Sequence, residues 1–223
     1  MAAAPADPLL WEDYSSLRGL GLSQRFLLRH PGIEVDGDRA EVLERLRPWH
    51  EAEVRDLGFQ PAALQLAEQV HGAGVALAEH GGGLAMGVDA LIAQAPGTLL
   101  GIYVADCAAV HLVDPVSGAF GLVHSGRKGT ELGIVAVTLA SLAAQFGSRA
   151  ADVRVQISPC IRPPAYEVDF AAMIRRQCLE AGVRPEHFAD AGVCTSGDLR
   201  RYYSYRMEKG RTGRMLALLG KPL

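Results

Sequence analysis

Between Ala62 and His124 the chain alternates short apolar runs with glycine, aspartate and proline. This pattern is typical of strands separated by turns, because glycine and proline interrupt the extended runs that pack on a sheet. The runs predicted as strands are 75–78, 90–93, 99–104, 110–113 and 120–123, with a turn over 114–118. The same reasoning predicts two later strands, over 153–157 and 215–219.

Apolar residues at helical spacing predict four helices, which cover 38–57, 130–146, 170–181 and 197–207. In the first of these, Val42, Leu46 and Trp49 follow the helical period, and Pro48 marks a kink or an end. Thr130 is the expected N-cap of the second helix, and Gly147 its end.

Neither a repeat nor a linker-like segment divides the chain. We therefore predict one domain of the mixed α/β (α+β) class over 21–223, because apolar runs of both periods are interleaved along it. Residues 1–20 are predicted to form an N-terminal extension, loose at first and then tied down near Trp11 and Tyr14.

Composition narrows the class of protein. The chain has 223 residues, of which 49% are hydrophobic, so it can bury a sizeable core. Its net charge is -3 and no lysine-rich run occurs, so we expect no nucleic-acid partner. The four cysteines (107, 160, 178 and 194) lack CxxC spacing, and neither a signal peptide nor a run of ~18 apolar residues is present. These features predict a cytoplasmic enzyme with reduced thiols and no membrane partner.

Three residues stand out as candidate metal ligands. His71, Cys107 and His124 each follow an apolar, strand-like run, so their side chains could converge at strand ends. Two imidazoles and a thiolate form a zinc-type ligand set that leaves a fourth position open, and the set is soft enough for copper. Spacing alone does not fix such a site, so packing in the core stays an alternative. Asp106 is a candidate partner that would orient a ligand.

Two further segments carry candidate binding residues. Arg127 and Lys128 lie in a glycine-containing loop that leads into a helix, which favours an anion such as phosphate, although a solvated basic turn fits equally well. The segment Tyr202–Arg206 combines aromatic residues with arginine and could cover a flat ligand, or pack ordinarily against the sheet.

An ordered series of motifs gives these residues a context. The series is Gln69-Val-His-Gly72, Val88-Asp-Ala-Leu91, Ala105-Asp-Cys107, His124-x-Gly126, Ile157-Ser-Pro-Cys160, Tyr166-Glu-Val168 and Tyr203-Ser-Tyr-Arg206. It spans about residues 25 to 219 and resembles the laccase-domain family. Members of that family are described as multi-copper polyphenol oxidoreductases and as purine nucleoside phosphorylases.

The resemblance implies a fold, a metal site and an activity. The fold would be a layered sandwich of mixed β-sheet and helices that resembles the catalytic domain of cytotoxic necrotizing factor. The metal ligands, and with them the catalytic residues, would be His71, Cys107 and His124, with zinc as the usual metal and copper as another. The substrates would be phosphate and a purine nucleoside, through phosphorolysis of adenosine, inosine or methylthioadenosine, with adenosine deamination as a further activity. The expected substrate-binding residues are Arg29, Asp106, Arg127, Lys128 and Arg206.

The chain departs from the family pattern at three places. The usual His-Ala-Gly-Trp-Arg-Gly reads His-Ser-Gly-Arg-Lys-Gly over 124–129, and lysine lacks the bidentate geometry of arginine. The usual Thr-Arg-x-Gly-Gly-x-Ser loop is shortened over 28–38, where Arg29 retains the arginine. Met207 replaces the second arginine of the usual Tyr-Arg-Arg. The ligands are thus retained while the substrate-recognition elements are altered.

Other functions remain open at this point. Cys107 could be the nucleophile of a metal-free hydrolase or amidase acting on a cell-wall precursor, with His124 or His71 as its base. The altered loops also leave open a metal-binding relative with a changed or lost substrate pocket. A copper phenol oxidase is not expected, because the seven histidines include no His-x-His pair of the kind that multicopper centres use.

Overall fold

Two mixed six-stranded sheets and four α-helices make up the described part of the chain. The computed structural model describes residues 10–79 and 81–223. The first sheet has the strand order β1-β2-β12-β7-β3-β5 and the second β11-β10-β8-β9-β6-β4. The strands of the first sheet are β1 Trp11–Glu12, β2 Ser23–Leu27, β12 Met215–Lys221, β7 Thr98–Val104, β3 Leu64–Ala67 and β5 Gly83–Ala85. Those of the second are β11 Phe188–Asp190, β10 Arg154–Ile157, β8 Ala108–Val113, β9 Phe120–Ser125, β6 Ala90–Ala93 and β4 Val75–Leu77.

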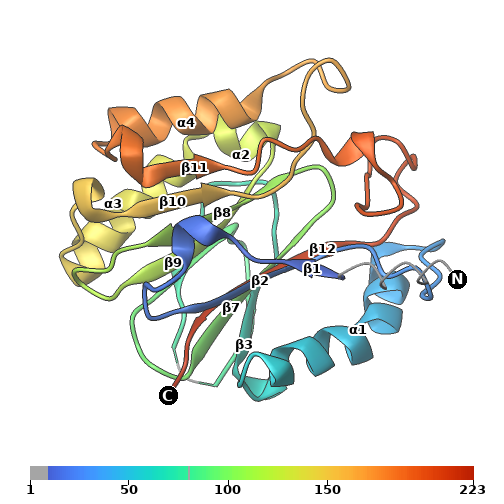
Figure 1. The fold of residues 1–223 in the computed structure, drawn as a ribbon, viewed down its shortest axis with the longest axis horizontal. Helices are drawn as coiled ribbons and strands as arrows, with labels where there is room; N and C mark the ends of the chain where they lie inside the picture. The colour runs from blue at the N-terminus through green and yellow to red at the C-terminus, as the bar shows by residue number, and fades with distance from the viewer. Residues whose placement is uncertain (1–9, 80) are drawn as a thin grey trace, which may run out of the picture.

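Helices cover the outer faces of the two sheets (Figure 1). The helices are α1 Arg39–Asp56, α2 Arg127–Glu131, α3 Ile134–Phe146 and α4 Phe170–Glu180. One apolar cluster joins α3 and α4 to the second sheet through residues such as Leu139, Ile174 and Val110. Another joins α1 to the first sheet through Val54 and Leu216.

The two sheets pack against each other through apolar side chains. A third apolar cluster fills the space between the sheets, with Phe26 and Leu100 from one and Leu122 from the other. The central strands β6, β8 and β9 are therefore buried along their whole length, which is why they read as continuous apolar runs rather than alternating ones.

Most of the predicted elements are present. The helix expected over 38–57 is α1, which Asp38 caps by accepting a hydrogen bond from the Glu41 backbone N–H, and which continues through Pro48. Strands β4, β6, β7, β8, β9, β10 and β12 and helix α4 match their predictions closely. Residues 1–9 and His80 lie outside the described residues. Trp11 pairs in β1 with β2 and Tyr14 is buried, so the expected tie-down there is confirmed.

One helix prediction was wrong, and another was wrong in its start while its expected end at Gly147 is confirmed. The helix expected over 130–146 is two helices, because Gly133 takes a left-handed conformation (φ 76°) between α2 and α3. Thr130 accordingly lies inside α2 and is not a cap; its hydroxyl donates back to the Gly126 carbonyl at 2.7 Å. The segment 197–207 forms turns instead of a helix, since long-range hydrogen bonds to Asp106 hold the Ser204 hydroxyl and the Arg206 backbone N–H.

The described helices include none that is both long and apolar enough to cross a lipid bilayer.

Buried histidines on the second sheet and on α1 predict acid sensitivity. His111 in β8 is fully buried beside Tyr14, and burial lowers its pKa to about 4; burial likewise lowers the pKa of His50 in α1 to about 3. The unfolded chain, with histidine pKa values near ~6.5, binds more protons, so stability is full above about pH 6.5 and falls as the pH drops towards 4.

The contribution of His111 to this loss is about 3 kcal/mol at the low end of the window. Urea denaturation between pH 7.5 and 4.5 measures it, with the variant His111→Leu as the comparison. We expect the variant to show a shallower pH dependence than the parent chain. Parallel curves for the two proteins would contradict the assignment to His111.

Candidate metal centre

His71 lies in a strained loop that follows β3. Its φ is 60° and that of Gln69 is 65°, both in the left-handed region that non-glycine residues rarely adopt. The buried Asp89 carboxylate holds the loop by accepting hydrogen bonds from three consecutive backbone N–H groups, those of Val70, His71 and Gly72, at 3.2, 2.9 and 2.7 Å. Strained backbone of this kind persists where the surroundings over-determine it, as they do here.

Gln69 completes the bracing of this loop. Its side-chain amide donates to the Tyr103 carbonyl at 2.5 Å and accepts from the Tyr103 N–H at 3.0 Å, which ties the loop to β7. The imidazole of His71 is thereby presented at the end of the first sheet.

Cys107 lies in the tight connection between β7 and β8, and its thiol is free. The preceding Asp106 has a φ of 82°. Its carboxylate accepts hydrogen bonds from the Thr195 hydroxyl (2.6 Å), the Ser204 hydroxyl (3.0 Å) and the Arg206 backbone N–H (2.7 Å). Asp106 therefore anchors the C-terminal loop beside Cys107.

His124 lies in β9 and is buried. Its Nδ1 is 2.8 Å from the Asp89 carboxylate, which leaves Nε2 facing the other two residues. The same carboxylate therefore positions both histidines. A carboxylate behind a histidine is the arrangement that fixes ring orientation in metal sites.

The three side chains converge. Their ligand atoms all lie within 4.8 Å of one another, and the two imidazole rings are 4.8 Å apart at 81°. A tetrahedral zinc with bonds of ~2.0–2.3 Å places its ligand atoms roughly 3.5 Å apart, so small side-chain movements would complete the geometry. The residues fit a His2Cys metal site with one open position.

Gly126 makes room for the thiol. A Cβ at this position would lie 2.5 Å from the Cys107 Sγ, a distance that real side chains do not tolerate. The absence of a side chain at Gly126 therefore lets the backbone approach the cysteine closely.

The side chains of the site also shift the pKa values of Cys107 and His124. Burial opposes the thiolate of Cys107, but hydrogen bonds from His124 and His71 outweigh it and lower the thiol pKa. Burial opposes the charged form of His124 as well, yet its contacts with Asp89 and Cys107 raise its pKa. Proximity of a thiolate to imidazolium explains both directions, and a thiolate is the form that binds a metal.

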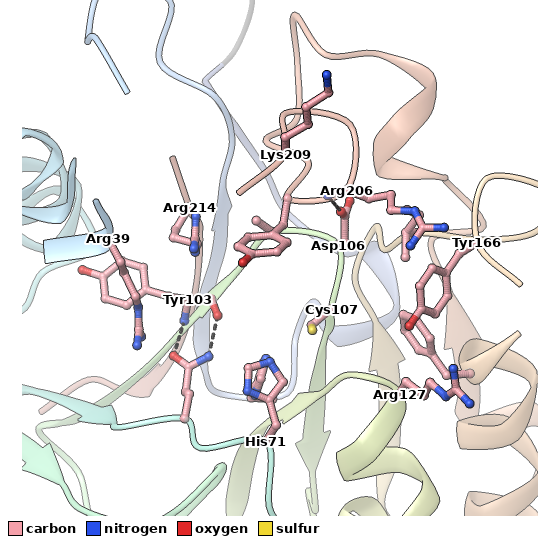
Figure 2. A pocket seen from close by; sticks show the side chains of 16 residues that line it. Arg39, His71, Tyr103, Asp106, Cys107, Arg127, Tyr166, Arg206, Lys209 and Arg214 are labelled. Carbon is pink, nitrogen blue, oxygen red and sulfur yellow. Dashed lines mark hydrogen bonds between the residues drawn. The ribbon is translucent and has the colours of Figure 1, made fainter. Parts of the chain in front are cut away.

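The ligand set opens into a cavity of about 580 Å³. Figure 2 shows His71 and Cys107 near its centre, with Arg39 and Arg214 on one side and Arg127, Arg206 and Tyr166 on the other. Ile161, Phe170 and Tyr205 add apolar surface to the wall. The volume lies within the range of small-molecule sites, so the shortened loop over 28–38 has not closed the cavity.

The predicted substrate-binding residues separate into two groups. Asp106, Arg127 and Arg206 line the cavity, while Arg29 and Lys128 do not. Arg29 pairs with Glu208 at 2.6 Å and lies over the Tyr203 ring, so it braces the C-terminal loop. Lys128 is an exposed residue of α2.

Sequence reasoning missed Asp89, Arg39 and Arg214. Asp89 belongs to the motif Val88-Asp-Ala-Leu91 but was given no role, because its hydrogen-bond partners come from other segments. Arg39 and Arg214 reach the cavity from α1 and from the residue before β12, so nothing local marked them.

Comparisons with known proteins identify a family and several relatives. A family model described as "Multi-copper polyphenol oxidoreductase laccase" matches residues 15–171 and 167–221. The purine nucleoside phosphorylase YlmD of Geobacillus stearothermophilus is 30% identical over 85% of this chain and 82% of its own length. A purine nucleoside phosphorylase of Deinococcus radiodurans is 34% identical over 74% of this chain and 73% of its own.

Solved structures agree in fold. The crystal structure of YlmD from Geobacillus stearothermophilus superposes with a TM-score of 0.83 at 25% identity, covering 97% of this chain and all of that one. The Bacillus licheniformis protein YfiH gives a TM-score of 0.81 at 21% identity over 89% of this chain and 92% of its own. The second of these is evidence for the fold alone.

Proposed function

The chain belongs to the multi-copper polyphenol oxidoreductase laccase family, and from its site we propose that it is a zinc-dependent enzyme that phosphorolyses purine nucleosides. The observation that carries the proposal is the convergence of His71, Cys107 and His124 within 4.8 Å at the floor of a cavity that contains both cations and aromatic side chains. The naming of two relatives as purine nucleoside phosphorylases supports it.

The proposed metal is zinc, because two imidazoles and one thiolate with an open position are the donors of a catalytic zinc site; copper would suit the same donors. Bound there, zinc would act as a Lewis acid towards an oxygen of the substrate or of water. The side chains of the protein supply the remaining functions of the site. Asp89 holds both histidines, and the side chains of the cavity wall bind and orient the nucleoside.

We place the purine base against the wall formed by Tyr166, Phe170 and Ile161. These residues give that side of the cavity an apolar surface, and Tyr166 lies at 73° to Phe170 in edge contact, which fixes its ring. Arg206 lies 5.6 Å over the Tyr166 ring and would add hydrogen-bond donors for the base. Arg127, on the same side, would contribute through its guanidinium at the rim.

The test is incubation of zinc-replete protein with adenosine, inosine or methylthioadenosine, with and without phosphate. Chromatography should show free base and ribose-1-phosphate (or its methylthio form) only when phosphate is present, and inosine from adenosine in either case if deamination also occurs. The variant Cys107→Ala is the control. Product formation equal to that of the control would overturn the proposed activity and would favour a relative whose pocket has lost its function.

One further observation supports a second candidate function. The chain of contacts from Asp89 through His124 to a Cys107 thiol of lowered pKa resembles the order of groups in a Cys-His hydrolase. Such an enzyme would act as an amidase on a cell-wall precursor without metal. Stoichiometric zinc in freshly purified protein would argue against it, whereas alkylation of Cys107 that chelator leaves unchanged would favour it.

We do not propose a multicopper oxidase. Within residues 10–79 and 81–223, the only group of three or more His, Cys, Asp or Glu side chains close enough to share an ion is that of His71, Cys107 and His124. One such site holds one ion, while oxidation of phenols by a multicopper centre needs several coppers held together.

A further inference from the structure

The four arginines that line the cavity fall into two pairs that differ in their partners. Arg127 and Arg206 both contact Glu167, at 3.3 and 3.8 Å, and Arg127 also pairs with Glu131 at 3.0 Å. Carboxylates therefore already compensate the positive charge on that side of the cavity.

Arg39 and Arg214 lack such compensation. Among the described residues, no carboxylate lies within ion-pair distance of either guanidinium. Arg214 is half-buried, and its Nη1 donates only to the neutral carbonyls of Thr212 and Gly213, at 2.8 Å each. Burial and the nearby Arg39 lower the pKa of Arg214, so the two cations lie close enough to repel each other.

The backbone that carries Arg39 is held in place, and its exposed side chain extends from there towards the cavity. Arg39 is the first residue of α1, fixed by the Asp38 cap. The segment before it is braced by Arg45, whose guanidinium donates to the Glu34 and Asp36 carbonyls at 2.9 and 3.1 Å, and by an ion pair between Asp36 and Arg211. Two like charges close together beside a cavity create a positive potential that a bound anion lowers.

The position of Arg39 and Arg214 relative to His71, Cys107 and His124 indicates which anion they would bind. Figure 2 shows Arg39 and Arg214 on the opposite side of His71 and Cys107 from Tyr166 and Arg206. With the base on the Tyr166 side, the ribose spans the floor and its C1′ carbon faces the Arg39 side. A nucleophile held there attacks opposite the leaving base, as a displacement at one carbon requires.

We propose that Arg39 and Arg214 form the subsite that binds inorganic phosphate as the nucleophile of the reaction. In that reaction an oxygen of HPO₄²⁻ forms a bond to C1′ while the bond from C1′ to the base nitrogen breaks. The base keeps the electron pair of that bond and takes up the proton that the phosphate loses, which gives the neutral base and the ribose-1-phosphate dianion. This inference rests on the proposed function for the reaction, while the binding of phosphate does not depend on turnover.

The experiment measures phosphate binding directly. Calorimetric titration of the full chain with inorganic phosphate, in a phosphate-free buffer at constant ionic strength, gives the dissociation constant. We expect Arg39→Met to weaken binding about tenfold or more, since it removes charge-assisted hydrogen bonds, and Arg39→Lys to restore part of it. Arg47→Met is the matched control, because Arg47 is an exposed arginine of the same helix that pairs only with Glu44.

Arg214→Lys tests the second residue. It keeps the charge and loses the fork geometry, so phosphate binding should weaken while urea denaturation reports a folded protein. Phosphate affinity that is equal in the parent, Arg39→Met and Arg214→Lys would overturn the subsite. Equal loss in Arg47→Met would overturn it as well, since the effect would then come from net charge.

Steady-state kinetics separates this inference from the proposed function. If both hold, Arg39→Met raises the KM for phosphate and leaves that for the nucleoside within about twofold. If phosphate binding depends on Arg39 but no turnover is detected, the subsite stands and the proposed activity is overturned. If the protein turns over nucleoside and Arg39→Met leaves the KM for phosphate unchanged, the activity stands and the subsite is overturned. Binding of a nucleoside 5′-monophosphate, but not of inorganic phosphate, would overturn the assignment and mark the pair as a nucleotide site.

Discussion

Asp89→Asn is expected to weaken zinc binding by about 10- to 100-fold, the usual effect of removing a carboxylate that orients metal-ligating histidines. The carboxylate accepts from four donors, of which the Val70 and Gly72 N–H groups reach one oxygen and the His71 N–H and the His124 Nδ1 reach the other. An amide offers one oxygen, so two donors would face an NH₂ group. The loop that carries His71 and the ring of His124 would both lose their fixed positions.

The same substitution should lower the free energy of unfolding by about 3 kcal/mol, because it leaves buried donors without acceptors. Competition with a chromophoric chelator measures the zinc affinity, and urea denaturation measures the stability. Asp114→Asn is the matched control: Asp114 is equally buried and accepts from the Val116 and Ser117 N–H groups, but it lies at the other end of β8 from Cys107. The control should lose stability and keep its zinc affinity. Equal zinc affinities in the two variants would contradict the role given to Asp89.

The strands were predictable because their burial is continuous. Strands β6 and β7 lie in sheets covered on both faces, so their side chains are apolar at nearly every position and local pattern alone identifies them. Strand β2 was not predicted, although it has five residues and lies inside the first sheet. The short strands β1, β5 and β11 were also missed. They have two or three residues each and lie at sheet edges, so they carry no pattern long enough to recognise.

The segment 197–207 shows where local reasoning fails. Its polar groups bond to a residue far away in the sequence: the Ser204 hydroxyl and the Arg206 backbone N–H both donate to the Asp106 carboxylate. Such bonds satisfy the backbone without a helix, and a pattern of apolar residues does not encode them. Arg29 is a second example of a contact that local sequence does not predict. A motif match located the residue, but its partner, Glu208, lies 179 positions further along the chain.

The candidate ligands could be proposed from the sequence, but their support could not. His71, Cys107 and His124 are marked by residue type and by their places after apolar runs. Asp89, which positions two of them, is separated from His71 and His124 by 18 and 35 positions. Only the folded arrangement, in which the loop after β3 and the strand β9 meet at the start of β6, brings these partners together.

Gly126→Ala should abolish zinc binding while leaving the protein folded. The new methyl group would lie 2.5 Å from the Cys107 Sγ, so either the thiol rotates out of the ligand set or the backbone moves. The backbone of Gly126 itself is extended (φ -95°, ψ -173°) and accepts alanine, so the whole effect comes from the clash with sulfur. Overpacking of this kind costs about 1–3 kcal/mol of stability, which a chain of this size tolerates.

Elemental analysis of purified protein and the phosphorolysis assay measure the outcome, with Gly197→Ala as the matched control. Gly197 has open space around its missing side chain, so the control should retain both zinc and activity. Because Gly126→Ala leaves the thiol chemically intact, it also separates the two candidate functions. A zinc enzyme would lose turnover together with its metal, since two histidines alone do not complete the site. Retained zinc at the parental stoichiometry would mean that the Cys107 sulfur is not a ligand.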